Sequence, residues 1–171
     1  MMFFQKKLIT LLLLSFLMIT NSFAENKIVY IDLEFILSNS ETGKKLLHKL
    51  KESENNMIEE FKTKENNLKN EENKILASRN IISKDAFDEK VLIFQKELEQ
   101  YKKYKSEEID NLKKNRDDEI MQLINKFKTL IEDYMKENSI TMIIDRKNIF
   151  IGDKNYDITN KILAKINNNI Q

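Results

Sequence analysis

Residues 83–105 read SKDAFDEKVLIFQKELEQYKKYK, and this stretch decides the fold. Its apolar residues recur at alternating spacings of four and three: Phe87, Val91, Phe94, Leu98 and Tyr101. That repeat is typical of a helix that packs along a second helix in a coiled coil. Ser83 is a suitable N-cap, and Asp85 in the first turn favours the helix dipole. The stretch therefore predicts a long helix that begins after Ser83.

The same repeat continues toward the C-terminus with a gap in its apolar character. Lys105 and Glu108 occupy the next seam positions. Apolar and aromatic residues then return: Leu112, Ile120, Leu123, Phe127, Leu130 and Tyr134. The helix is therefore predicted to run to about residue 136, with a wetter seam in its middle.

A partner helix is predicted immediately before it, over residues 44–79. Seven-residue steps give two seams, Leu47, Glu54, Phe61, Leu68, Ile75 and Leu50, Met57, Lys64, Glu71, Ser78. Six of these ten residues are apolar, which indicates an imperfect coiled coil. Residues 79–83 interrupt the pattern. The sequence therefore predicts an antiparallel helical hairpin, an arm over residues 44–136 with its tip near 79–83.

The composition agrees with long uninterrupted helices. Among 171 residues there are two glycines and no proline, which supply the tight turns of a β-sandwich or barrel poorly. The absence of cysteine excludes a disulfide framework and a thiolate metal site. A third of the residues are charged, with 29 Lys and Arg against 28 Asp and Glu, so the formal net charge is only +1.

The ends of the chain have a different character, with strand-like runs at 28–31, 141–144 and 149–151. Asp32 can cap a helical turn after the first run, and Gly43 marks a bend or a close helix contact. Asp157 opens a final helix with an apolar face: Ile158, Ile162, Leu163, Ile166 and Ile170. The predicted fold class is α+β, mostly α, with the coiled-coil arm inserted between strands of a small β body formed by residues 25–43 and 137–171.

This body is small for a chain so rich in charge. Three short strands and a few helical turns bury little apolar surface, and elements of this size are marginal alone. Association of several copies through the strands would supply the missing burial. We therefore expect an obligate oligomer.

The first 24 residues have the pattern of a cleaved signal peptide. Lys6 and Lys7 precede the apolar run 8–19, and small residues Ser22 and Ala24 follow it. The run is short for a membrane span, which needs roughly 20 residues. The alternative is an uncleaved N-terminal anchor.

Few residues suit catalysis, and no catalytic, metal or cofactor-binding residue is predicted. Asp117–Glu119 lie in succession and do not share one helix face, so a solvated surface explains them best. His48 has no second histidine or cysteine as a metal partner. Asp145 and Asp157 fit turn and N-cap roles better than an acid–base pair.

The aromatic residues of the arm are the more informative candidates. One interpretation is packing in the seam; the other is a partly wet surface that makes weak, numerous contacts to an unfolded client. Tyr104 lies off the strongest seam and is expected to be exposed, and methionine suits adaptable contacts. The candidate client-binding residues are Met57, Phe61, Phe87, Phe94, Tyr101 and Tyr104.

The chain resembles the Skp/OmpH family of periplasmic chaperones over its whole length after residue 24. The N-terminal resemblance is carried by residues 27–33, 36–37 and 40–45, and the tip resembles the family's at 82–86. The C-terminal resemblance is carried by Ile143-Ile144-Asp145-Arg146, Ile149-Phe150 and 157–163.

This resemblance implies a homotrimer whose arms enclose a cavity in the periplasm of a Gram-negative bacterium. Family members hold unfolded outer-membrane proteins there without ATP and release them toward the outer-membrane assembly machinery. It implies no cofactor and no enzymatic activity. The residues it assigns to the trimer body are Ile28, Tyr30, Ile31, Leu33, Ile143, Ile144, Ile149, Phe150, Ile158 and Ile162.

The charge balance departs from that of the strongly basic family members. Loss of Lys6 and Lys7 with the leader leaves 27 basic and 28 acidic residues. A basic excess is the mark of nucleic-acid binders, so nucleic acid is not an expected partner. For the same reason, binding to lipopolysaccharide or anionic lipid is expected less than binding to clients.

The alternative function is that of a structural coiled-coil spacer or tether of the cell envelope. Such a protein would have a continuous dry seam. The polar seam residues Lys64, Glu71, Lys105 and Glu108 argue against it.

Overall fold

The computed structural model describes residues 27–170, and the predicted signal peptide lies outside this range. Within it, no helix has both the length and the apolar character that a membrane span requires. The elements follow in the order β1 (Lys27–Ile31), α2 (Leu33–Asn39), α3 (Glu41–Ser78), α4 (Lys84–Glu137), β2 (Ile140–Asp145), the 3-10 turns η1 (Arg146–Asn148) and η2 (Lys154–Tyr156), and α5 (Thr159–Asn169).

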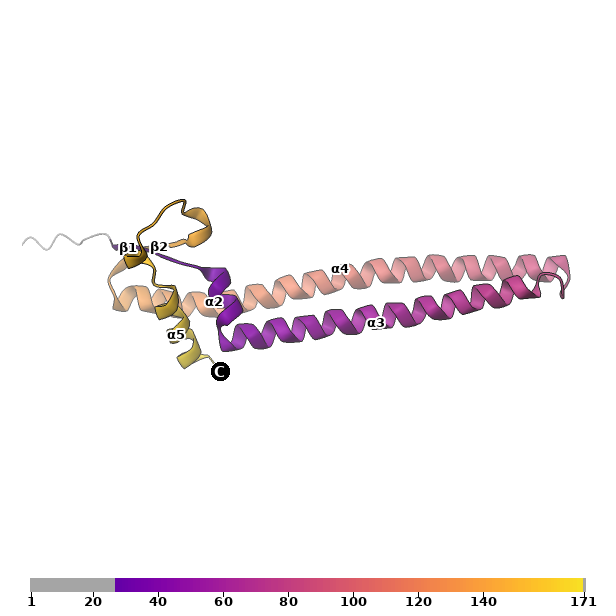
Figure 1. The fold of residues 1–171 in the computed structure, drawn as a ribbon, viewed down its shortest axis with the longest axis horizontal. Helices are drawn as coiled ribbons and strands as arrows, with labels where there is room; N and C mark the ends of the chain where they lie inside the picture. The colour runs from indigo at the N-terminus through magenta and orange to yellow at the C-terminus, as the bar shows by residue number, and fades with distance from the viewer. Residues whose placement is uncertain (1–26, 171) are drawn as a thin grey trace, which may run out of the picture.

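α3 and α4 form an antiparallel arm that projects from a small body (Figure 1). With a rise of 1.5 Å per residue, the 38 residues of α3 span about 57 Å and the 54 residues of α4 about 81 Å. The turn at the tip covers residues 79–83. The Ser83 hydroxyl accepts a hydrogen bond from the Ala86 amide, which confirms its predicted role as N-cap.

The predicted seams are confirmed by burial. On α3 every predicted seam residue except Glu71 is at least partly buried, and Phe61 and Ile75 are almost fully buried. On α4 every predicted seam residue from Phe87 to Tyr134 is at least partly buried. The polar seam residues other than Glu71 are therefore partly buried along the arm.

The core of the molecule lies in the body and includes the last third of α4. β1 and β2 pair in parallel, with Val29 opposite Ile143 and Tyr30 opposite Ile144. The buried cluster comprises Val29, Ile31, Ile36, Leu123, Phe127, Ile140, Ile158, Ile162 and Ile166. The apolar face predicted for the final helix is confirmed. The body also begins earlier on α4 than residue 137, because Leu123 and Phe127 belong to its core.

The predicted strand at 149–151 is wrong, and the described residues contain a sheet of two strands. A later segment extends along β1 instead, since Tyr30 bridges to Asp157 and the Ile158 amide donates to the Tyr30 carbonyl at 3.0 Å. Residues 149–151 instead leave the sheet as a loop, with Phe150 98 % and Ile151 83 % exposed.

Two polar contacts fix the junction between body and arm. Asp32 caps α2 by accepting from the Phe35 amide at 2.8 Å, as expected from the sequence. The fully buried Ser40 hydroxyl accepts from the Gly43 amide at 3.1 Å and starts α3. The chain therefore turns sharply between α2 and α3, where Gly43 lies against the end of α2.

Candidate functional site

Three aromatic rings meet at the middle of the arm. Phe61 of α3 contacts Tyr101 and Tyr104 of α4 edge-on, with ring centroids 6.5 and 6.3 Å apart. Edge-to-face packing is a favourable geometry for aromatic pairs. Phe61 is only 6 % exposed, so its ring fills the seam rather than the surface.

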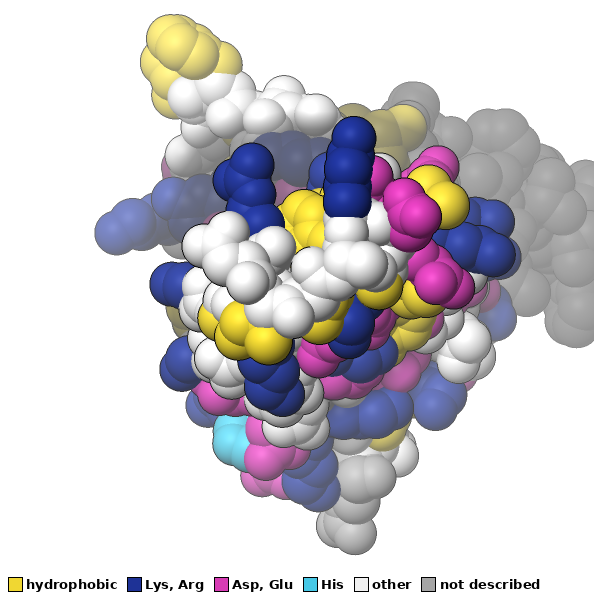
Figure 2. Space-filling model, turned by 90° about the vertical axis from the view of Figure 1, so that its right-hand side faces the viewer, with side chains coloured by type: hydrophobic (Ala, Val, Ile, Leu, Met, Phe, Trp, Pro, Cys, Tyr) yellow, Lys and Arg dark blue, Asp and Glu magenta, His cyan; other side chains and the backbone are white. Residues whose placement is uncertain are grey.

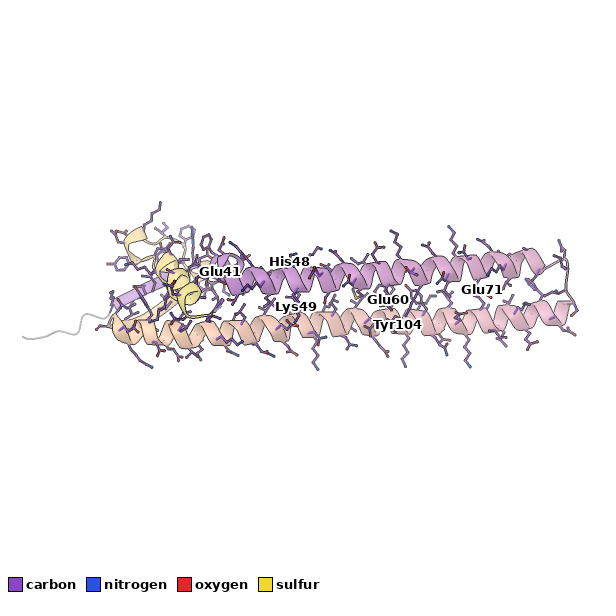
Figure 3. The ribbon with its side chains drawn as sticks, turned by 90° about the horizontal axis from the view of Figure 1, so that it is seen from below. Glu41, His48, Lys49, Glu60, Glu71 and Tyr104 are labelled. Atoms are coloured by element: carbon purple, nitrogen blue, oxygen red, sulfur yellow. The ribbon has the colours of Figure 1, made fainter. Side chains whose placement is uncertain are left out.

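Charged side chains enclose these rings on both sides. The Tyr104 hydroxyl donates to Glu60 Oε1 at 2.5 Å, and Lys64 Nζ lies 3.0 Å from the same oxygen and 3.6 Å from the Tyr104 ring centroid. Glu60 and Tyr104 face one another across the helices in Figure 3. The Tyr104 hydrogen bond and then the Lys64 ammonium hold the pKa of Glu60 below its ordinary value.

A matching set surrounds Tyr101. Its hydroxyl donates to Glu65 Oε1 at 2.9 Å, and Lys105 Nζ lies 2.6 Å from that oxygen. Lys105 and then Tyr101 lower the pKa of Glu65. Burial, followed by the Glu65 carboxylate, raises the pKa of Tyr101 to about 12. Both tyrosines are therefore held between the helices as neutral donors.

The exposure expected for Tyr104 is wrong, because its ring packs on Phe61 and its hydroxyl reaches across to Glu60. Its position next to Lys105 places it on the edge of the seam, where a long side chain can still cross to α3. Among the other candidates, Met57, Phe87 and Phe94 are half-buried. Phe61, Tyr101 and Tyr104 are brought together, whereas Phe87 lies nearer the tip.

Open grooves run between α3 and α4 on either side of the seam. A groove of about 390 Å³ near the base is lined by Leu47, Leu50, Lys51, Glu54, Met57, Ile58, Ile109, Leu112, Lys113 and Arg116. A second, of about 500 Å³, is lined further out by Glu65, Leu68, Lys69, Glu72, Phe94, Leu98, Tyr101, Lys102 and Lys105. A third, of about 410 Å³, is lined by Lys64, Asn67, Leu68, Glu71, Glu97, Gln100, Tyr101 and Tyr104.

Several of these lining residues were not among the candidates predicted from the sequence. Ile58, Ile109 and Lys113 each follow a seam residue by one position. These residues lie outside the seam positions themselves. Their signal in the sequence is that each directly follows a seam residue.

The body carries a second surface of exposed apolar side chains. Those with two-fifths or more of their surface exposed are Ile28, Phe35, Met142, Phe150, Ile151 and Tyr156. A depression of about 420 Å³ on the sheet connects several of them with Ile144 and Ile149. Of the residues assigned to the trimer body, Tyr30, Ile31, Ile158 and Ile162 pack in the chain's own interior. Leu33 and Ile143 are half-buried.

The residues considered for catalysis or metal binding lie at turns or on the surface. Asp145 accepts from the Lys147 amide, and Asp157 accepts from the Thr159 amide, each over two residues. His48 is a surface side chain 3.5 Å from Glu52. Among residues 27–170, no three His, Cys, Asp or Glu side chains form a group that could hold a metal ion.

Charges of both signs are mixed over the arm when the molecule is viewed from its tip (Figure 2). Ion pairs join the helices at intervals; Lys49 Nζ, for example, lies 2.8 Å from Glu119 Oε2. Glu119, the last member of the acidic run, therefore contacts α3 rather than solvent alone. The arm offers grooves and charged flanks for binding.

The family comparison and the structural comparison both find OmpH-like proteins. A family model described as "Outer membrane protein (OmpH-like)" matches residues 27–166. A search of curated proteins finds no significant match. Among solved structures, a candidate outer membrane chaperone (OmpH-like) from Caulobacter crescentus has a TM-score of 0.78 at 16 % identity. The match covers 84 % of this chain and 85 % of that one.

Proposed function

This chain belongs to the OmpH-like family, and we propose on that premise that it is an ATP-independent holding chaperone for unfolded outer-membrane proteins. The observation that carries the proposal is the extent of the family match, which includes the body and both helices of the arm. The architecture supports it, because long arms with partly apolar grooves suit many weak contacts to an unfolded chain.

In this proposal three copies join through their bodies and their arms enclose the client. The exposed Phe150 and Ile151 support association, since large apolar side chains gathered on a body this small mark a protein interface. The protein acts in the periplasm after removal of residues 1–24, and hands clients to the outer-membrane assembly machinery. It needs no cofactor.

The test is suppression of aggregation by the protein recovered from the periplasm after export. A urea-unfolded outer-membrane barrel is diluted into buffer without nucleotide, and light scattering is followed. We expect the barrel to stay soluble at one trimer per client, and a natively folded soluble protein to show no binding. Unchanged scattering with the chaperone in molar excess would exclude the holding function.

A further inference from the structure

The two broad faces of the arm differ, although its total charge is balanced. In an antiparallel pair of helices, the residues that directly follow seam residues emerge on the same face of both helices. The grooves confirm this geometry, because Ile58 of α3 shares one groove with Ile109 and Lys113 of α4. We call this the groove face. The opposite face carries the residues that directly precede seam residues.

Positive charge is concentrated on the groove face. The two grooves that open there are lined by six cations, Lys51, Lys69, Lys102, Lys105, Lys113 and Arg116, and by three carboxylates, Glu54, Glu65 and Glu72. The groove on the opposite face has one cation, Lys64, and two carboxylates, Glu71 and Glu97. The even charge count of the arm therefore conceals a basic side.

Exposed apolar side chains are concentrated on the same side. Among the large apolar residues of α3 and α4 with high exposure, four follow a seam residue: Ile58, Leu76, Leu92 and Met121. One, Ile93, precedes a seam residue and belongs to the opposite face. Apolar contact and positive charge thus coincide along one face of the arm.

We infer that the groove face is the docking surface for unfolded segments, and that it selects segments in which apolar side chains alternate with carboxylates. This inference rests on the proposed function and specifies which segments of a client are held. Apolar side chains of the segment enter the grooves, and its carboxylates pair with Lys102, Lys113 and Arg116 at the rim.

The carboxylates within the grooves favour a polypeptide as the occupant. Glu72, together with the Glu54 and Glu65 oxygens that Lys51, Tyr101 and Lys105 leave open, can accept hydrogen bonds from the amide groups of an extended chain. The ionised phosphates of anionic lipids carry no hydrogen-bond donor and would be repelled by these carboxylates. The mixed lining therefore suits a chain that offers donors and acidic side chains together.

Charge-reversed variants with a matched control test the inference. Lys102→Glu with Lys113→Glu changes the groove face, and Lys74→Glu with Lys90→Glu makes the same change of net charge at positions that precede seam residues. The probes are two fluorescent extended peptides with the same apolar residues, one with acidic and one with lysine residues between them. Fluorescence anisotropy measures their binding.

We expect the wild-type protein to prefer the acidic peptide. The groove-face variant should bind it roughly tenfold more weakly, and the control within about twofold of wild type. Circular dichroism confirms that each variant folds. Equal binding of both peptides, or equal losses in both variants, would overturn the inference.

A second pair of variants tests the apolar part. Leu92→Ser and Ile93→Ser alter neighbouring exposed residues on opposite faces. Only Leu92→Ser should weaken the acidic peptide, by about fivefold. If the wild type suppresses aggregation but both substitutions weaken peptide binding equally, the assignment of the binding face is wrong. If the wild type does not suppress aggregation, the proposed function itself is wrong.

Discussion

At the scale of single residues, the junction between body and arm depends on Gly43. A Cβ atom at this position would lie 1.7 Å from the Leu37 carbonyl oxygen and 2.6 Å from Ser40 Oγ. The first contact is with backbone, which cannot move aside as a flexible side chain can. The close approach of α3 to the end of α2 therefore requires the absence of a side chain.

We predict that Gly43→Ala destabilises the protein by about 2–3 kcal/mol, because the end of α2 must shift away from α3. The sign is diagnostic, since Gly→Ala within an unhindered helix is stabilising by roughly 0.5–1 kcal/mol. Urea unfolding followed by circular dichroism measures the effect. Asn55→Ala, at an exposed position of α3, is the control and should be slightly stabilising. An increase in stability for Gly43→Ala would contradict the packing described.

At the scale of elements, the arm was predictable because a helical seam repeats and each repeat adds the same evidence. Many successive turns of spacing four and three are hard to mistake, even with Lys64 and Lys105 in the seam. The run at 149–151 is short, and its β-branched and aromatic composition cannot show that Asp157 occupies the edge of β1. Which of two distant segments extends along β1 leaves no periodic pattern in the sequence.

The candidate site was also predictable only in part. Seam position correctly predicted that Phe61 and Tyr101 face the partner helix, and the structure shows that they contact each other. It could not place Tyr104, because a long side chain beside the seam chooses between solvent and the partner helix according to the groups which that helix presents. Here Glu60 and Lys64 supply a hydrogen-bond acceptor and a cation over the ring.

We predict that the arm loses helicity at high pH through Tyr101. Its pKa in the folded protein is about 12, above the ordinary 10.0, so the neutral phenol stabilises the fold fully below pH 10. That contribution is lost as the pH rises from 10 to about 12. Tyr101→Phe should therefore show a smaller loss of stability over this interval than wild type.

Urea unfolding at a series of pH values, with tyrosinate absorbance recorded in parallel, measures this difference. If stability falls equally with pH in Tyr101→Phe and in the wild type, the pKa of the Tyr101 phenol is not raised in the folded protein.

At the scale of the whole molecule, the body has an apolar exterior that its own chain leaves open. We predict that Phe150→Ser with Ile151→Ser weakens self-association roughly a hundredfold, because both side chains are almost fully exposed in the single subunit. Sedimentation velocity over a concentration series measures the assembly.

Ile81→Ser is the matched control, since Ile81 is 82 % exposed but lies in the turn at the tip. It should leave the sedimentation profile of the wild type unchanged. A trimer that survives the double substitution, or that is lost in Ile81→Ser, would place the subunit contact elsewhere.

One continuous element joins the tip to the interior of the body. α4 begins at Lys84 beside the tip and ends with Leu123, Phe127 and Ile131 packed in or against the core. In mechanical terms it is a cantilever, clamped at one end and free at the other. Gentle helix curvature accumulates along such a beam, so displacement is greatest at the tip and least at the base. In the proposed function, arms built this way act as calipers that can spread around clients of different girths while the clamp stays still.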